Sequence, residues 1–376
     1  MKEYPAIKFL DLKAINQGFE PELTRMLLKI SQSGQFVNGE ISEKFEKNFA
    51  NYIGTEHCIS LGNGTNALEL ILKAYMVMGI LGKKDEILVP ANTFFATFLA
   101  ISNQGLVPVP VEPDPSTFNI CVSSLEQKIN KKTRGLLLVH LFGRNAYSDK
   151  IKHLVEKHGL KLIEDNAQAV GSIYNETRTG ALGHAAAHSF YPTKNLGALG
   201  DAGAVTTNDL ELATTVRALG NYGGKEKYVF ECLGTHSKMD EIQAGVLNVK
   251  LPYLDESNRL RNEIARTYLT EIDSIYLTLP KTPEQNQSLS HTWHLFTILV
   301  SRRENLIRHL SKMGIETTIH YPIPPHLQPV YSHTNFGPLP ITEKIHNETL
   351  SIPLNPILTK AEIKYIIDTI NNWNGK

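Results

Sequence analysis

The chain has 376 residues, and its 38 basic residues balance 38 acidic residues, so its formal net charge at pH 7 is zero. This balance gives no reason to expect a polyanion-wrapping protein or attraction to an anionic membrane. The length predicts one large domain and one smaller domain, which we place at residues 1–255 and 256–376.

The three cysteines, Cys58, Cys121 and Cys232, lie far apart and form no CxxC pair. Their spacing argues against a disulfide framework and against a zinc ribbon, and we predict no metal site. The first twelve residues mix charges with short apolar pieces, unlike a signal peptide, and no apolar run approaches membrane-spanning length. We therefore expect a cytoplasmic protein.

Between residues 55 and 210, short apolar runs alternate with amphipathic stretches. Two helices, Glu40–Ile53 and Thr65–Tyr75, are clear from apolar side chains at helical spacing. The alternation predicts an α/β fold in which a mostly parallel, seven-stranded sheet is flanked by helices, with ligands beyond the carboxyl ends of its strands. The expected strands are His57–Leu61, Glu86–Pro90, Leu106–Val111, Gly135–Leu141, Leu160–Glu164, His188–Tyr191 and Gly203–Thr207.

A different pattern follows the alternating region. Two long helices are expected, and the polar stretch Pro280–Ser290 reads as the boundary of the smaller domain. A strand, a helix ended by Gly314 and a final helix follow, which predicts a small α+β domain. The expected elements of this part are Lys238–Lys250, Leu254–Ile272, Trp293–Val300, Glu304–Met313 and Lys360–Trp373.

Two residues near strand ends match the needs of a pyridoxal phosphate site. Asp165 lies in the segment Ile163-Glu164-Asp165-Asn166-Ala167-Gln168, and Lys194 ends Ser189-Phe190-Tyr191-Pro192-Thr193-Lys194. Taken alone, such an aspartate usually caps the next helix, and most lysines are solvated charges. Because Lys194 stands among apolar side chains and before a glycine-rich stretch, we interpret the two residues together as a cofactor site.

Asp165 is the candidate partner of the cofactor's ring nitrogen, which must stay protonated for the ring to withdraw electrons. A carboxylate about 4 Å away contributes on the order of 4 kcal/mol at an effective dielectric of 20. Lys194 is the candidate that carries the cofactor as a Schiff base. Its amine must be partly neutral to act as a base, and burial and the pyridinium both lower a lysine pKa.

The phosphate group of the cofactor needs hydrogen-bond donors. The unpaired amides at the start of a helix offer them, here at Gly64, Thr65 and Asn66. The hydroxyls of Thr65 and Ser189 add further donors. The chain lacks both the GxGxxG fingerprint and the Walker pattern, which argues against a dehydrogenase on a parallel sheet.

Four runs of sequence resemble the DegT-like sugar-nucleotide aminotransferases of the aspartate aminotransferase superfamily. They are Pro90-Ala-Asn-Thr-Phe-Phe-Ala-Thr97, Ile163-Glu-Asp-Asn-Ala-Gln168, the glycine-rich segment from His188 through Lys194 to Gly203, and Met239-Asp-Glu-Ile-Gln243-Ala. The resemblance covers nearly the whole chain, and the Lys194 motif is highly specific. Sister enzymes that dehydrate sugars have histidine in place of this lysine, so Lys194 excludes that reading.

The resemblance implies a fold-type-I homodimer with active sites at the subunit interface and L-glutamate as amino donor. It also implies roles for individual residues. Phe94 would stack on the pyridine ring, Gln168 would flank that ring, and Asn221 would reach the phosphate from the partner subunit. Tyr191, His320 and Tyr321 are the candidates that approach the sugar, although alone His320 would more often be structural.

Several features look closest to the branch that aminates C-3 of dTDP-linked 3-keto-6-deoxyhexoses, among them the run His320-Tyr-Pro-Ile-Pro-Pro-His326. Amination at C-4 of a 4-keto-6-deoxyhexose is the alternative within the class. A cofactor-bound regulatory protein without catalysis is the alternative from another class. Where relatives carry Asn-x-Arg, this chain has His236-Ser-Lys238, which keeps the charge of a substrate contact but not the arginine fork.

Overall fold

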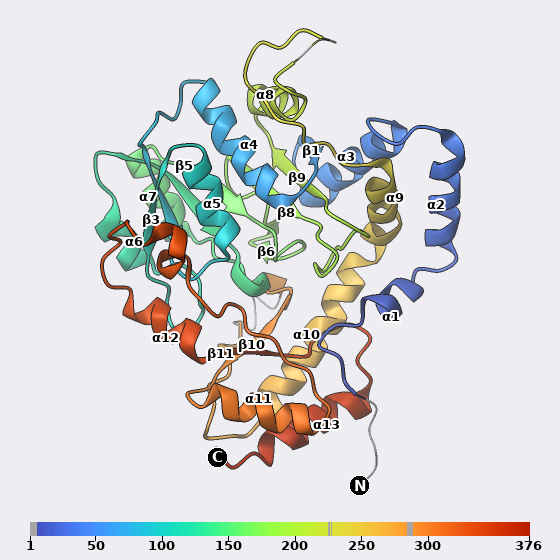
Figure 1. Ribbon diagram of the computed structural model, residues 1–376, viewed down its shortest axis with the longest axis vertical. Coiled ribbons are helices and arrows are strands. Elements are labelled where there is room, and N and C mark those ends of the chain that lie inside the picture. The colour runs from blue at the N-terminus through green and yellow to red at the C-terminus, as the bar shows by residue number, and fades with distance from the viewer. Residues whose placement is uncertain (1–5, 225, 227, 284–288) are drawn as a thin grey trace.

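The computed structural model describes residues 6–224, 226, 228–283 and 289–376, and a seven-stranded sheet forms its centre (Figure 1). The strand order is β1-β9-β8-β5-β4-β2-β3, and β9 runs antiparallel to β1 and β8 while the other neighbours pair in parallel. The sequence-based prediction of a mostly parallel sheet is confirmed. The strands are β1 His57–Leu61, β2 Glu86–Pro90, β3 Val107–Val111, β4 Thr133–Val139, β5 Lys161–Asp165, β8 Ala185–Ser189 and β9 Gly203–Thr207.

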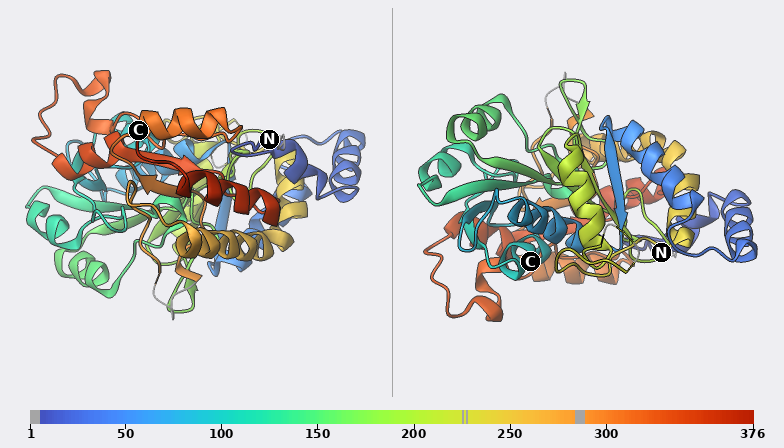
Figure 2. Two further views of the ribbon diagram at one scale, coloured as in Figure 1. Left: turned by 90° about the horizontal axis from the view of Figure 1, so that it is seen from below. Right: turned by 90° about the horizontal axis from the view of Figure 1, so that it is seen from above.

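Alternating side chains give each strand two buried faces. On β5, Ile163 packs on one face with α4 and α8, whereas Leu162 packs on the other with α6 and α7. Helices α3 and α9 cover the second face at its β1 end, and both faces are covered in Figure 2. The helices of this part are α3 Glu40–Ile53, α4 Gly64–Val77, α5 Phe95–Asn103, α6 Val122–Lys128, α7 Asp149–His158, α8 Leu210–Gly220 and α9 Glu241–Lys250.

A second core lies below the sheet in Figure 1. It contains Ile7 and apolar residues between positions 264 and 373, and helix α10 (Leu254–Glu271) runs from the sheet layer into it. Our domain boundary at 255/256 falls inside α10, and the division into two domains remains our proposal. The other elements here are β10 Phe296–Leu299, α11 Arg303–Lys312, α12 Pro340–Glu348, β11 Thr349–Ile352 and α13 Lys360–Asn371.

Several expected boundaries were wrong. The strand expected at His188–Tyr191 ends at Ser189, because Phe190 turns into the core next to Phe45 and Phe49. The strand expected to reach Leu141 ends at Val139, where Leu141–Gly143 forms a 3-10 turn. The helix expected from Lys238 begins at Glu241, and the strand expected from Trp293 begins at Phe296 because Trp293 has a positive φ of 49°.

Some elements had no sequence-based prediction. They include the amino-terminal helices α1 Leu12–Gln17 and α2 Glu22–Ser33 and the short pair β6 Ile173–Tyr174 and β7 Thr177–Arg178. Part of the polar stretch Pro280–Ser290 lies outside the described residues. Within the described part of the chain, we find no helix whose length and apolar character would let it span a membrane.

Candidate active site

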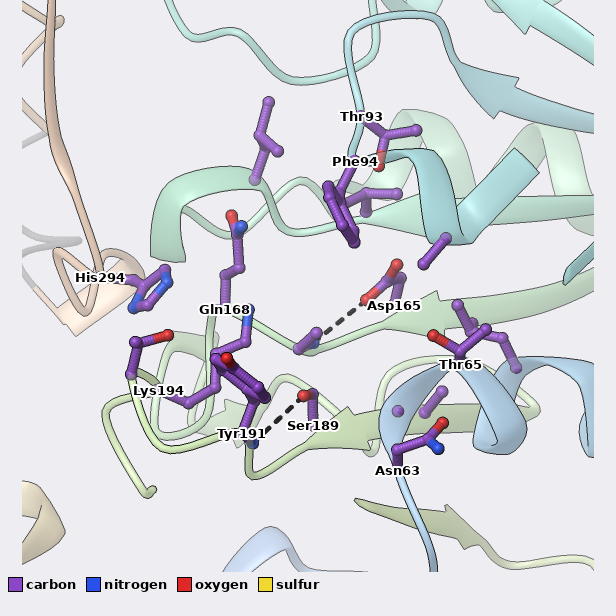
Figure 3. A pocket seen from close by; sticks show the side chains of 18 of the residues that line it. Asn63, Thr65, Thr93, Phe94, Asp165, Gln168, Ser189, Tyr191, Lys194 and His294 are labelled. Carbon is purple, nitrogen blue, oxygen red and sulfur yellow. Dashed lines mark hydrogen bonds between the residues drawn. The ribbon is translucent and has the colours of Figure 1, made fainter. Parts of the chain in front are cut away.

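A cavity of about 550 Å³ opens at the carboxyl ends of β4, β5 and β8 (Figure 3). Asp165 and Lys194, which are distant in sequence, both line it. The start of α4 forms one side, and residues of the second core form another. The predicted residues that line it are Gly64, Thr65, Asn66, Phe94, Asp165, Gln168, Ser189, Tyr191, Lys194, His320 and Tyr321.

Asp165 is the last residue of β5 and is buried. Its Oδ2 accepts a hydrogen bond from Thr97 Oγ1 at 3.0 Å, and its Oδ1 accepts one from the amide of Ala167 at 3.2 Å. Burial raises the pKa of this carboxyl, while those two donors and the positive charge of Lys194 act in the opposite direction. A cation placed beside Asp165 would therefore favour its ionised form.

Lys194 follows β8 in a turn in which its amide donates to the carbonyl of Tyr191 at 2.8 Å. The side chain is partly buried, and this burial lowers the pKa of its amine to about 8, against a smaller opposite effect of Asp165. With this pKa roughly a tenth of the amine is neutral at pH 7, far more than for a lysine with the ordinary value of 10.5. Nucleophilic attack on a carbonyl and removal of a proton both require the neutral amine, whereas delivery of a proton requires the protonated form.

The amino-terminal end of α4 lies at the floor of the cavity. Asn63 caps the helix by accepting the Asn66 amide at 2.8 Å, which leaves the amides of Gly64 and Thr65 as the anion-binding donors at this end. A Cβ at Gly64 would lie 2.7 Å from Ser189 Cβ, and one at Gly203 would lie 2.3 Å from the backbone of Asn63. Glycine is required at both positions for this close approach.

An aromatic and amide cluster forms the upper wall. Gln168 accepts the amide of Phe142 at 2.6 Å and donates to the hydroxyl of Tyr321 at 2.8 Å. The ring of Phe94 lies 5.1 Å from that of Tyr321. Phe94 is 52% exposed, so it is not the core residue that a phenylalanine would be by default.

Two residues had no sequence-based prediction, namely Thr97, which bonds a lining residue, and His294, which lines the cavity itself. Thr97 lies one helical turn after Phe94 and donates a hydrogen bond to Asp165. Both residues belong to the run Pro90–Thr97, and this run was the signal that could have identified Thr97. His294 comes from the second core and bonds Asn195 Oδ1 through Nδ1 at 3.0 Å. Burial lowers its pKa well below the ordinary value, so it is neutral at pH 7. No local pattern marked His294.

Asn221 and Lys238 do not line this cavity. Both line a separate cavity of about 370 Å³ near Glu46 and Arg217. Lys238 Nζ lies 6.0 Å from the centre of the Tyr222 ring. A single chain therefore does not bring these two predicted residues to Lys194, and a contribution from a partner subunit remains a proposal.

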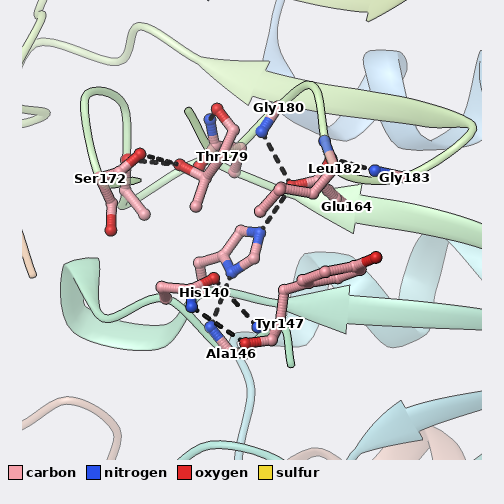
Figure 4. A network of polar contacts seen from close by, with 12 residues as sticks. His140, Ala146, Tyr147, Glu164, Ser172, Thr179, Gly180, Leu182 and Gly183 are labelled. Carbon is pink, nitrogen blue, oxygen red and sulfur yellow. Dashed lines mark hydrogen bonds and ion pairs between the residues drawn. The ribbon is translucent and has the colours of Figure 1, made fainter. Parts of the chain in front are cut away.

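A buried polar network lies on the other face of β5 (Figure 4). The carboxylate of Glu164 accepts the amides of Gly180, Leu182 and Gly183 at 2.7–2.8 Å and a hydrogen bond from His140 Nε2 at 2.8 Å. Since His140 Nδ1 accepts the amide of Ala146, its proton is on Nε2. This network fixes the strand end that carries Asp165.

The geometry fits the comparisons with known proteins. Residues 19–371 match the DegT/DnrJ/EryC1/StrS aminotransferase family. The chain belongs to this family. The fold-type-I assignment and the aminotransferase activity expected from the Lys194 motif are thereby confirmed.

Two relatives and one solved structure are especially similar. A dTDP-3-amino-3,6-dideoxy-alpha-D-galactopyranose transaminase from Aneurinibacillus thermoaerophilus is 43% identical, over 98% of this chain and 99% of the relative. An erythromycin biosynthesis sensory transduction protein, EryC1, from Saccharopolyspora erythraea is also 43% identical, over 97% and 98%. The structure of S. venezuelae DesV with a ketimine intermediate superposes with a TM-score of 0.93 at 40% identity, covering 98% of this chain and 99% of DesV.

Aminotransferases of this family use pyridoxal phosphate, and a similar solved structure, ntda from Bacillus subtilis, with 30% identity and a TM-score of 0.88, holds the cofactor as PMP. The residues of the cavity fit this group. The cavity is lined by a buried carboxylate that has no ion pair among the described residues, by amides of a helix start and by a partly neutral lysine. The cofactor expected from the sequence is therefore confirmed.

Proposed function

We propose that the protein transfers an amino group from L-glutamate to C-3 of a dTDP-linked 3-keto-6-deoxyhexose. The observation that carries the proposal is the single cavity lined by Asp165, Lys194 and the start of α4. The 43% identity to a dTDP-3-amino sugar transaminase over nearly the full length supports the sugar, the nucleotide and the position of amination. We further propose a cytoplasmic homodimer.

Bound pyridoxal phosphate supplies an aldehyde carbon and an electron-withdrawing ring. In the proposal, Asp165 holds the proton on the ring nitrogen, and Thr97 keeps the Asp165 carboxylate oriented and ionised. Gly64, Thr65, Asn66 and Ser189 hold the phosphate, joined by Asn221 of the partner subunit. Phe94 and Gln168, which line the cavity, would contact the ring of the bound cofactor.

Lys194 has two roles in the proposal. Its Nζ would hold bound pyridoxal phosphate, and once freed by the amino donor it would accept the proton from the donor's α carbon. In the second half of the cycle Nζ delivers a proton to the sugar carbon that receives the amine. The pKa of about 8 suits both directions of transfer near neutral pH.

The contacts to the acceptor sugar are assigned by the position of residues around the cavity. Tyr191, His320 and Tyr321 line the cavity and are proposed to contact the sugar. His320 Nδ1 bonds Ser351 Oγ at 2.9 Å, and burial lowers the pKa of His320 to about 4, so it would contact hydroxyls as a neutral group. Lys238 is proposed to contact the diphosphate.

The test is a half-reaction. Protein loaded with pyridoxamine phosphate is mixed separately with 3-keto and 4-keto dTDP-6-deoxyhexoses, and the return of the lysine-bound cofactor absorbance is recorded. A reaction with the 3-keto sugar supports the proposal, whereas a preference for the 4-keto sugar would assign C-4 amination.

The EryC1 relative is named a sensory transduction protein, which makes a regulatory role the second candidate function. The same half-reaction tests it. A regulatory protein would bind the cofactor but exchange no amine between glutamate and either sugar. Amine exchange at rates of at least about one per second, within the usual range of enzymes, would exclude it.

A further inference from the structure

A smaller cavity of about 240 Å³ lies beside the main one. The two share Thr193, His294 and His320 as lining residues, so these three side chains form the partition between them. The smaller cavity is also lined by Arg261, which comes from α10. Arg261 does not line the main cavity itself.

Arg261 is 3% exposed, and it lacks a negative partner among the described residues. Its Nη1 donates to the carbonyl of Leu354 at 3.0 Å and, more weakly, to that of Trp293 at 3.5 Å, while its Nε has no hydrogen-bond partner. Burial lowers the pKa of Arg261 to about 10 and no acid counteracts this. The side chain remains a cation at pH 7.

The surroundings offer this charge little compensation. None of the described residues that line the smaller cavity is an aspartate or a glutamate, and His294 and His320 are neutral at pH 7. Arg261 also lines a third cavity of about 220 Å³ that Lys194 borders. The one acid there, among the described residues, is exposed Glu256, whose two oxygens pair with Arg259 at 2.7 Å.

An unpaired buried cation is costly unless an anion completes the site. A carboxylate is the natural complement of a guanidinium, since the edge formed by Nε and Nη2 can bind both of its oxygens. The hydroxyls of Thr193 and Thr318 line the same space. A ligand that reacts at Lys194 and has a carboxylate at its other end would occupy both cavities and pair with Arg261.

We propose that Arg261 forms a subsite that binds the distal carboxylate of a dicarboxylic amino donor. The carbon chain of the donor would pass His294 and His320, which line both cavities. This inference rests on the proposed function, because it presumes an amino acid reacting at Lys194. It specifies which donor the enzyme selects and by which residue.

The test compares L-glutamate with L-glutamine, which has the same shape but a neutral distal group. The holoenzyme and the variant Arg261→Gln are each mixed with either amino acid, and the loss of lysine-bound cofactor absorbance gives kcat/KM for the donor half-reaction. In the variant we expect a fall of roughly 10- to 100-fold for glutamate, as for lost hydrogen bonds to a charged group, and little change for glutamine. Arg261→Lys should restore part of the preference.

The matched control is Arg259→Gln, on the same helix but exposed and paired with Glu256. It should leave both amino acids unaffected. An equal fall for glutamate and glutamine in Arg261→Gln would overturn the proposal and leave Arg261 as a strut between α10 and the carbonyls of residues 293 and 354. The keto-sugar half-reaction is measured in parallel, so failure of the proposed acceptor is seen separately from failure of the donor subsite.

If Arg261→Gln does not fold, the wild-type holoenzyme still decides. Glutarate, an unreactive dicarboxylate, should raise its Tm more than pentanoate, which has one carboxylate, at equal concentration. Equal shifts for the two acids would contradict a second carboxylate site.

Discussion

The hydroxyl of Thr97 donates to Oδ2 of Asp165 at 3.0 Å, linking the first turn of α5 to the end of β5. Thr97 is fully buried, and its hydroxyl also contacts that of Thr93 at 2.9 Å. The carboxylate that we assign to the ring nitrogen is therefore held by a residue outside the β5 segment.

Replacing Thr97 by valine should impair catalysis most at low pH. The hydroxyl lowers the pKa of Asp165, so its loss raises that pKa further and shrinks the ionised fraction. We expect kcat/KM to fall about tenfold. We also expect the acidic limb of the pH profile of kcat/KM to shift to higher pH. Thr97→Ser keeps the hydroxyl and should behave like the wild type; an unmoved limb in Thr97→Val would argue against the role.

Asp165→Asn should retain cofactor but transaminate poorly. A neutral amide cannot stabilise a protonated ring nitrogen, and the lost attraction, on the order of 4 kcal/mol at most, corresponds to roughly a thousandfold in rate. Single-turnover kinetics with glutamate measure the effect. Asp149→Asn, in the exposed first turn of α7, serves as the control. Near-normal rates in Asp165→Asn would place the ring elsewhere.

Lys194→Ala should abolish turnover and the absorbance of the lysine-bound cofactor, because no other lysine among the described residues lines the main cavity. Exposed Lys152→Ala is the control and should change neither. Full activity in Lys194→Ala would refute the assignment.

The cofactor-free protein should gain stability from Lys194→Met in a pH-dependent way. The pKa of Lys194 falls from its ordinary 10.5 to about 8 on folding, so between these pH values the unfolded chain binds more protons and the wild-type free energy of unfolding rises with pH. Below pH 8 the variant should be more stable by about 2 kcal/mol, allowing for partial exposure, and the gap should close above pH 10.5. Urea unfolding across this range tests the sign.

Glu164→Gln should destabilise the fold. The amide nitrogen would face backbone donors that now meet a carboxylate, and breaking a buried charged network costs on the order of 3 kcal/mol. Glu156→Gln, exposed on α7, is the control. A midpoint of urea unfolding that equals the wild type would show that the loop at residues 180–183 does not depend on Glu164.

The sequence-based prediction succeeded where chemistry and local pattern coincide. Asp165 and Lys194 each stand near the end of a strand whose apolar run was recognisable, so their meeting at one sheet edge follows from parallel topology. The start of α4 was also recognisable from a local pattern, the glycines on either side of Asn63.

Residues that act across long sequence separations were not predictable in this way. His294 and Arg261 approach the site through packing between the two cores, and no periodicity encodes that approach. Element ends shifted by two or three residues where a side chain such as Phe190 found a tertiary partner.

The walls of the cavity have separate origins, since Asp165 and Lys194 belong to the sheet layer while His294 and His320 belong to the segment beyond α10. Unfolding confined to the second core would therefore leave the cofactor bound to Lys194 but reduce the selectivity for substrates. We expect partly denatured preparations to keep the absorbance of the lysine-bound cofactor after they have lost selectivity for the amino donor and the sugar. Cofactor absorbance alone is therefore a poor measure of active enzyme.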